Sequence, residues 1–330
     1  MLVPSILDVA KKAGVSAATV SHVINGTKKV SPSTRQKVDD AIRILDYKPN
    51  IAARNFKTGK MNVIAFIVPD IANPFFSTLI DEIETVLASK GYKLIILNTK
   101  ETKSREKEII STLSRGMADG LMIASTMEEY DEIRMLIPDG MPAIFIDRKL
   151  SGCPKCTICV DCYEATCQGI EDFIRHGHRR IGIITGLSRI STSKERLAAY
   201  ENVMKSHGLY DPDLVKIGDS MTHCVKSHLT SLLDAGCTAI AITNNFMAVE
   251  AMMLMQQSGI KPGRDIEILG FKDSSIAQYG LQHMSLVCQP TAELGRLAGR
   301  QMLNLLEDPT LPSSTIILQG TYVPHEISRD

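Results

Sequence analysis

Two short helices joined by a tight turn are predicted by Ile6-Leu7-Asp8-Val9-Ala10-Lys11-Lys12-Ala13-Gly14-Val15-Ser16-Ala17-Ala18-Thr19-Val20-Ser21-His22-Val23. Gly14 supplies the positive φ of the turn, and Ser16 is a typical N-cap for the second helix. Ala10 is small enough for that helix to cross close above it. The residues spaced to pack the two helices together are Val9, Val15, Val20 and Val23. The outward face then carries Ala17, Ala18, Thr19, Ser21 and His22. Short side chains on an exposed second helix are typical of a DNA-binding helix-turn-helix, although a plain helical hairpin has the same spacing.

Charge is unevenly distributed along the chain. The 37 basic and 37 acidic residues of the 330 cancel, but residues 1–60 hold eleven Lys or Arg against four Asp, a net of +7, which leaves −7 for residues 61–330. A basic N-terminal region on an acidic body is typical of a nucleic-acid-binding module joined to another domain. No apolar run is long enough to cross a bilayer, and no signal peptide precedes the first helix. We therefore expect a cytoplasmic protein without a membrane partner.

From Met61 onward the hydrophobic pattern alternates between strands and helices. Continuous apolar runs such as Val63–Val68 are typical of parallel strands buried on both faces. This stretch predicts a doubly wound α/β body with two lobes, and ligands in such sheets bind at the carboxyl ends of the strands. Motifs for nucleotide-binding loops, serine hydrolases and zinc proteases are missing, so we expect neither an enzyme nor a bound cofactor.

Five cysteines crowd together, and four of them are three residues apart. They are Cys153, Cys156, Cys159, Cys162 and Cys167. That spacing is superficially similar to a zinc or iron–sulfur ligand set. However, Thr157–Asp161 is predicted to be a buried strand, in which residues three apart point to opposite faces. We expect packing cysteines and no metal, with metal or redox use as the alternative.

Several segments together resemble the lactose/galactose-repressor (LacI/GalR) family. They are Asp8–Ser21, Val38–Ala41, Tyr47–Asn50, Val68–Phe76, Asp147–Arg148, Gly177–Gly182, Glu195–Leu197, Gly270–Phe271, Gln289–Pro290 and Glu293–Gly295. The resemblance covers the whole chain. It implies a regulator, usually a repressor of sugar-catabolic genes, that binds double-stranded palindromic operator DNA as a homodimer and senses a small-molecule effector. A sugar-binding module without DNA function is the alternative.

The resemblance also implies a domain organisation. A helix-turn-helix headpiece covers residues 1–48, a hinge helix residues 49–60, and a core like a type I periplasmic sugar-binding protein residues 61–330. The N-lobe would comprise residues 61–160 and 290–318, and the C-lobe residues 161–289 and 319–330. Three crossovers would lie near Val160–Cys162, Gln289–Thr291 and Leu318–Gly320.

By position in the family, the base-reading residues are Ala17, Ala18 and His22. The contacts to phosphate are Ser5, Ser16, Thr19, Ser21, Asn25, Ser31, Thr34, Tyr47 and Asn50. His22 departs from the usual Arg, and an imidazole replaces the two-bond grip of a guanidinium with one bond. In the hinge, Phe56 aligns with the side chain that opens a base step in the minor groove, beside Ala53 and Arg54. Packing of Phe56 on the body is the alternative.

The effector contacts implied by the resemblance are Asn73, Phe75, Phe76, Asp147, Arg148, Arg196, Asn244 and Gln289. Aromatic faces and polar side chains of this kind suit a small polyol, although both phenylalanines could instead belong to the core. Where many relatives have Asp after Gly-Phe, this chain has Lys272. With Arg148 and Arg196, Lys272 would make three cations near one pocket against Asp147, so we expect an acidic sugar. Alternatively, Lys272 points to solvent or pairs with Asp273.

Overall fold

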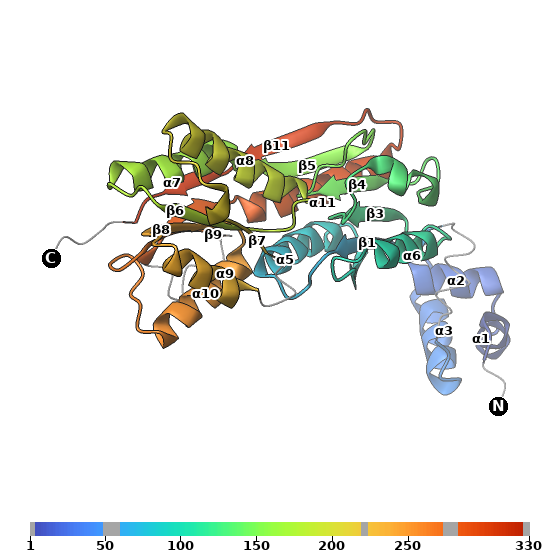
Figure 1. Cartoon of the computed structure of the whole chain (residues 1–330). Coiled ribbons are helices and arrows are strands. Elements are labelled where there is room, and N and C mark those ends of the chain that lie inside the picture. Colours follow the sequence, from blue (N-terminus) through green and yellow to red (C-terminus); the bar gives the residue numbers. More distant parts are fainter. Residues whose placement is uncertain (1–3, 49–59, 219–223, 273–282, 326–330) are drawn as a thin grey trace. The chain divides into compact units, whose positions relative to one another are not determined.

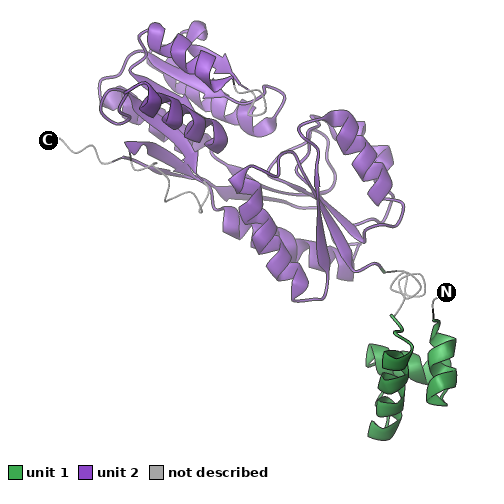
Figure 2. Ribbon diagram, turned by 90° about the horizontal axis from the view of Figure 1, so that it is seen from below, with its two compact units in different colours: residues 1–60 green, residues 61–330 purple. Residues whose placement is uncertain are grey.

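The computed structural model describes residues 4–48, 60–218, 224–272 and 283–325. The chain divides into two compact units, residues 1–60 and residues 61–330 (Figure 2).

The first unit contains three helices, α1 (Ile6–Ala13), α2 (Ala17–Asn25) and α3 (Pro32–Ile44). Gly14 has a φ of 66° and ends α1, and the Ser16 hydroxyl accepts a hydrogen bond from the Thr19 N–H at 3.1 Å. The predicted turn and cap are therefore confirmed. The core of this unit consists of Val9, Ala10, Ala13, Val20, Val23, Val38 and Ala41, with Val15 packed at its edge.

The first lobe of the second unit is built on a six-stranded parallel sheet with the order β11-β5-β4-β3-β1-β2. Its strands are β1 (Val63–Val68), β2 (Lys93–Asn98), β3 (Gly120–Ile123), β4 (Ala143–Ile146), β5 (Cys156–Asp161) and β11 (Thr315–Gln319). Helices α5 (Pro74–Ala88) and α11 (Thr291–Glu307) pack side by side on one face (Figure 1). Helix α6 (Lys103–Leu113) and the short helices η1 (Tyr130–Glu132) and η2 (Arg134–Leu136) cover the other face.

The second lobe has another six-stranded sheet, with the order β12-β10-β9-β8-β6-β7. Its strands are β6 (Ile181–Thr185), β7 (Val215–Ile217), β8 (Ala239–Ile242), β9 (Glu267–Lys272), β10 (Ser285–Cys288) and β12 (Thr321–Val323), of which only β12 is antiparallel to its neighbour. Helices α7 (Tyr163–Arg175) and α8 (Ser191–Ser206) pack on one face. Helices α9 (Val225–Asp234) and α10 (Asn245–Gln257) pack on the other, and η3 (Pro212–Leu214) precedes β7.

The chain passes between the two sheets three times, between β5 and α7, between β10 and α11, and between β11 and β12. Two of these crossovers touch, because the Gly320 N–H donates to the Asp161 carbonyl at 2.8 Å. A Cβ on Gly320 would lie 2.8 Å from the Cys162 sulfur, so only glycine allows this approach without a shift. The predicted two-lobed α/β core with doubly wound parallel sheets is confirmed.

Two details of the predicted elements were wrong. The sequence pattern predicts a helix over residues 77–90, but α5 begins at Pro74, because Asn73 caps it and Pro74 occupies its first turn. The short strands β7 and β12 were missed, since three residues carry too little periodicity to detect.

Three of the five clustered cysteines are buried in the first lobe and the crossover, whereas Cys153 and Cys167, the latter on α7, are half-buried. Cys156, Cys159 and Cys162 are buried, and burial raises the pKa of the Cys159 and Cys162 thiols to about 11. Within the described ranges no three Cys, His, Asp or Glu side chains are grouped as metal ligands would be. The buried thiols of Cys159 and Cys162 therefore stay protonated at neutral pH, which makes them poor nucleophiles.

Candidate functional site

In the first unit, helix α2 presents short polar side chains around its exposed face. Ala18 is exposed, whereas Ala17, Thr19, Ser21 and His22 are half-buried. The polar groups among them are held by neighbours: the Thr19 hydroxyl lies 2.9 Å from that of Ser16, and the Asn25 amide donates to the Ser21 carbonyl at 2.9 Å. The His22 Nδ1 lies 2.8 Å from the Thr27 hydroxyl, which leaves Nε2 as the ring atom that can reach a base edge.

The predicted phosphate contacts include the residue that caps the start of each helix in this unit. Ser5, Ser16 and Ser31 are the N-caps of α1, α2 and α3. Helix N-termini carry N–H groups that attract phosphate, so these positions suit contacts to a DNA backbone. The Thr34 hydroxyl accepts from Ser31 at 2.8 Å, and Tyr47 packs against the headpiece core. The predicted hinge contacts Asn50, Ala53, Arg54 and Phe56 lie outside the described residues.

In the second unit, a pocket of about 70 Å³ lies where the lobes meet. The structure brings together there eight of the nine effector residues expected from the sequence. These are Asn73, Phe75, Phe76, Asp147, Arg148, Arg196, Asn244 and Gln289. Thr192, Asn245 and Phe271 also line it. Ligand pockets usually measure roughly 300–1,000 Å³, so a sugar would enter only if the lobes or their side chains moved apart.

The first lobe contributes an apolar wall to this pocket. The Asn73 side chain accepts from the Phe75 N–H at 3.0 Å and so fixes the start of α5. The rings of Phe75 and Phe76 meet edge to face with their centroids 5.2 Å apart. Both side chains belong to the core of the lobe and also line the pocket, so a place in the core does not exclude the predicted contact with an effector.

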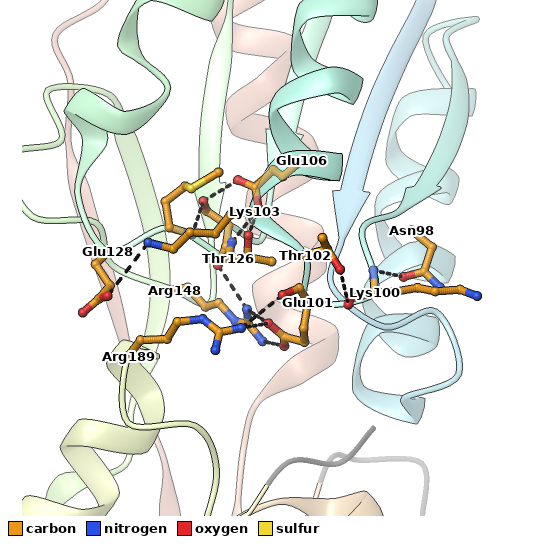
Figure 3. Close-up of polar contacts among 12 residues, drawn as sticks. Asn98, Lys100, Glu101, Thr102, Lys103, Glu106, Thr126, Glu128, Arg148 and Arg189 are labelled. Carbon is orange, nitrogen blue, oxygen red and sulfur yellow. Dashed lines mark hydrogen bonds and ion pairs between the residues drawn. The ribbon is translucent and has the colours of Figure 1, made fainter. Parts of the chain in front are cut away.

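Asp147 and Arg148 follow β4 at the carboxyl edge of the first sheet. Asp147 has a φ of 68°, a left-handed conformation that costs a non-glycine residue about 1–2 kcal/mol. Burial raises the pKa of its carboxyl group, although the charges of Arg148 and Arg196 oppose the shift. Arg148 donates through both terminal nitrogens to the carboxylate of Glu101, and through one of them to the Ser125 carbonyl at 3.1 Å (Figure 3).

The second lobe contributes Arg196 from the start of α8. Its guanidinium donates to the Thr243 carbonyl at 2.6 Å and to the Gln289 side chain at 3.1 Å. It also lies over the Phe271 ring, 4.2 Å from the centroid, in a cation–π contact. The side chains of Arg196, Gln289 and Phe271, which line the pocket, therefore fix one another's positions.

Polar contacts join the lobes beside the pocket. The Lys149 N–H donates to the Ser191 hydroxyl at 2.9 Å, and the Lys194 ammonium lies 3.1 Å from the Glu128 carboxylate. Arg189 donates to the Glu101 carbonyl at 3.1 Å. These contacts hold the lobes together next to the residues that would meet a ligand.

The expected cluster of three cations does not form. Lys272 ends β9, paired in register with Cys288, and it is not among the residues that line the pocket. Arg148 is already paired with Glu101, a residue that the sequence motifs did not single out. Glu101 closely follows β2, and its place at the carboxyl end of a strand was the signal that could have found it. The expectation of an acidic effector therefore loses its premise.

Comparison with known proteins adds two family matches. Residues 5–50 match the model of bacterial regulatory proteins of the lacI family, and residues 170–326 match a periplasmic binding protein-like domain. The chain is 30% identical to the ribose operon repressor of Haemophilus influenzae over 97% of both chains. It is also 30% identical to the transcriptional regulator GalR of Escherichia coli, over 98% of this chain and 96% of that one.

Among solved structures, a lac repressor dimer bound to operator and an anti-inducer has the same fold. Its TM-score is 0.82 at 23% identity, over 98% of this chain and 99% of that chain. No helix in the described ranges is both long enough and apolar enough to cross a membrane.

Proposed function

The chain belongs to the lacI family of bacterial regulatory proteins. We propose that it is a homodimeric repressor whose affinity for a palindromic operator changes when a small sugar binds. The members of this family are DNA-binding transcriptional regulators and not enzymes. The observation that carries the proposal is the presence, in one chain, of an exposed helix α2 and of a polar pocket between two lobes.

For DNA, we assign major-groove contact to Ala17, Ala18 and His22. Alanine methyl groups can contact thymine methyls, and His22 can offer one hydrogen bond from Nε2. The caps Ser5, Ser16 and Ser31 would then set the register on the phosphates. The net charge of +7 on residues 1–60 supports this assignment, and the DNA would be met in the cytoplasm.

For the dimer, we assign the edge of the first sheet to the second copy. Strand β2 is the last strand of that sheet, and beside it a groove of about 740 Å³ is lined by apolar side chains that include Ile95, Leu97 and Ile109. Met117 on its rim is 52% exposed. An open strand edge with exposed apolar side chains favours association. Met117→Glu should weaken the dimer in sedimentation without unfolding the chain, and an unchanged dimer would contradict this assignment.

For the effector, the relatives named as ribose operon repressor and GalR support a sugar. Its binding would separate or rotate the lobes, since the pocket is too small as it stands. Such a movement would change the separation of the two headpieces and hence operator affinity. A complete switch would need a difference of about 5.5 kcal/mol in sugar affinity between the two states, and a smaller difference gives a partial response.

The test is a gel shift with fragments of the source genome, repeated with a panel of sugars. A retarded fragment that contains an inverted repeat, and is released by one sugar, is the expected result. Sugar binding without any retarded fragment would favour the alternative, a binding module without DNA function. If neither DNA nor sugar binds, the proposal fails.

A further inference from the structure

Both arginines of the pocket have their terminal nitrogens occupied by the protein. Arg148 uses its two terminal nitrogens on the Glu101 carboxylate, and Arg196 uses its own on the Thr243 carbonyl and Gln289. The Nε of each arginine is buried and has no hydrogen-bond partner among the described residues. In both arginines the end-on fork formed by the two terminal nitrogens is therefore occupied by the protein itself.

Glu101 reaches Arg148 from outside the set of residues that line the pocket. It follows β2, and both it and Lys100 have positive φ, 54° and 52°. That turn points the Glu101 carboxylate at Arg148, where the two side chains are only 13% and 10% exposed (Figure 3). Arg189, which is 29% exposed, approaches the same carboxylate at 3.8 Å. The partner of Arg148 is thus an internal carboxylate, which an anionic ligand would have to displace to use the two terminal nitrogens.

What the pocket still offers suits hydroxyl groups. The Nε–H groups of Arg148 and Arg196 are donors without a protein partner, and the Asp147 carboxylate is an acceptor that lies 4.0 Å from the Arg148 Nε. A sugar hydroxyl can accept from such an N–H and donate to such a carboxylate. The carboxylates of Asp147 and Glu101 face the guanidinium groups of Arg148 and Arg196, so both arginines of the pocket already have a negative partner inside the protein.

We propose that Glu101 determines the charge of the effector: it occupies Arg148 in place of an anionic ligand, so that the pocket selects an uncharged sugar. The inference rests on the proposed function, because it takes the pocket between the lobes to be the sugar site. Glu101 acts through Arg148 and is a positioning residue.

The test uses matched pairs of neutral and acidic sugars on the full-length protein. Titration calorimetry would compare glucose with glucuronate, galactose with galacturonate, and ribose with ribose 5-phosphate. The intact protein should bind the neutral member of at least one pair about tenfold or more tightly than the acidic member. Glu101→Gln keeps the size of the side chain but frees the two terminal nitrogens of Arg148. In this variant the ratio of the neutral to the acidic affinity should fall at least tenfold, because the acidic member binds more tightly.

Two further variants separate the role of Glu101 as the counter-ion of Arg148 from other effects of its charge and contacts. Glu307→Gln removes one negative charge at an exposed site at the end of α11, and it should leave the ratio unchanged. Arg189→Gln removes the contact of Glu101 with the second lobe but keeps the pair with Arg148, and it should also leave the ratio unchanged. Melting temperature and operator binding of every variant would show that it is folded.

Three results would overturn the inference. Tighter binding of an acidic sugar by the intact protein would do so while leaving the sugar-responsive repressor in place. Glu101 would only hold the two lobes together if Glu101→Gln lost affinity equally for both members of a pair. The same conclusion would follow if Arg189→Gln changed the affinity ratio as much as Glu101→Gln does. If no sugar in the panel binds or alters operator binding, this inference and the proposed effector class fail together.

Discussion

The two units of this protein present functional side chains in opposite ways. On the headpiece, the residues assigned to DNA lie on the surface of three short helices whose core has seven buried side chains in the part that the structure describes. In the second unit, the residues assigned to the effector are themselves buried, and Asp147, Arg148, Arg196 and Gln289 are each less than 10% exposed. A surface residue can change without disturbing the fold, whereas a buried hydrogen-bonded residue serves the fold and the site together.

This difference predicts that mutations in the two units will have different effects on binding and on stability. Substitutions of Ala17, Ala18 or His22 on α2 should alter operator preference with little effect on stability, because none of these side chains is fully buried. Substitutions in the pocket should weaken both ligand binding and the fold, because they leave buried partners without hydrogen bonds. Four predictions test this contrast, from the largest expected effect to the smallest.

The largest effect is expected where the headpiece core itself is broken. Val20 is fully buried, and Val20→Asp would place an unpaired carboxylate in a small core, at a cost of several kcal/mol. Operator affinity in a gel shift should fall by about a thousandfold or more, a loss of roughly 4 kcal/mol, while calorimetric sugar affinity stays the same. The control Ile44→Asp, at a site that is 63% exposed, should keep a folded headpiece. A parallel loss of sugar binding in Val20→Asp would contradict the independence of the two units.

The next effect concerns the pocket. Arg196→Met keeps much of the volume but removes the hydrogen bonds to Thr243 and Gln289 and the cation–π contact with Phe271. We expect a loss of about 2–4 kcal/mol in the free energy of unfolding and a sugar affinity at least tenfold lower. Chemical denaturation and calorimetry would measure both. Arg264→Met, at a side chain that is 74% exposed, is the matched control and should change neither. A loss of sugar affinity at full stability would show that buried residues of the pocket are not structural.

A smaller effect is expected on the DNA face. His22→Arg would replace a single imidazole bond with a guanidinium fork, so affinity for operators with guanine at the facing position should rise by about 1–3 kcal/mol. Binding selection with randomised half-sites would reveal the change as a new preference at one position. The melting temperature of the headpiece should stay the same, since His22 is hydrogen-bonded only to Thr27 among the described residues. An altered preference at several positions would mean that α2 docks differently.

The smallest effect concerns pH. Burial raises the pKa of Glu106, although hydrogen bonds from Ser125 and Thr126 oppose the change. A carboxyl group with a raised pKa in the folded state contributes stability that is fully present below its unfolded pKa, near 4.5, and is lost as pH rises through the folded pKa. A tenfold difference in proton affinity between the folded and unfolded states corresponds to about 1.4 kcal/mol of stability.

As pH rises from 5 to 8, the free energy of unfolding should therefore fall less in Glu106→Gln than in the intact protein, as measured by urea unfolding. Glu108→Gln, on the exposed side of the same helix, should follow the intact protein. If Glu106→Gln shows the same pH dependence as the intact protein, Glu106 is not the group that titrates.

The headpiece could be predicted in detail because its signals are local. Gly14 with its positive φ, the Ser16 cap and the buried Val9 and Val20 are consequences of neighbouring residues within one short motif. The strands of the core were likewise visible as continuous apolar runs. The start of α5 and the strands β7 and β12 escaped, since a cap or three residues of strand give almost no periodic pattern.

The sequence by itself determined the helix-turn-helix, the alternation of strands and helices, and the family that the motifs at Asp147–Arg148 and Gln289–Pro290 indicate. Only the tertiary structure decided which charges face one another across the pocket. It brought Glu101 to Arg148 over 47 positions of the chain and left Lys272 out of the lining. The physical reason is that a helix cap depends on backbone a few residues away, whereas the partner of a buried charge depends on where separate strands end in the folded sheet.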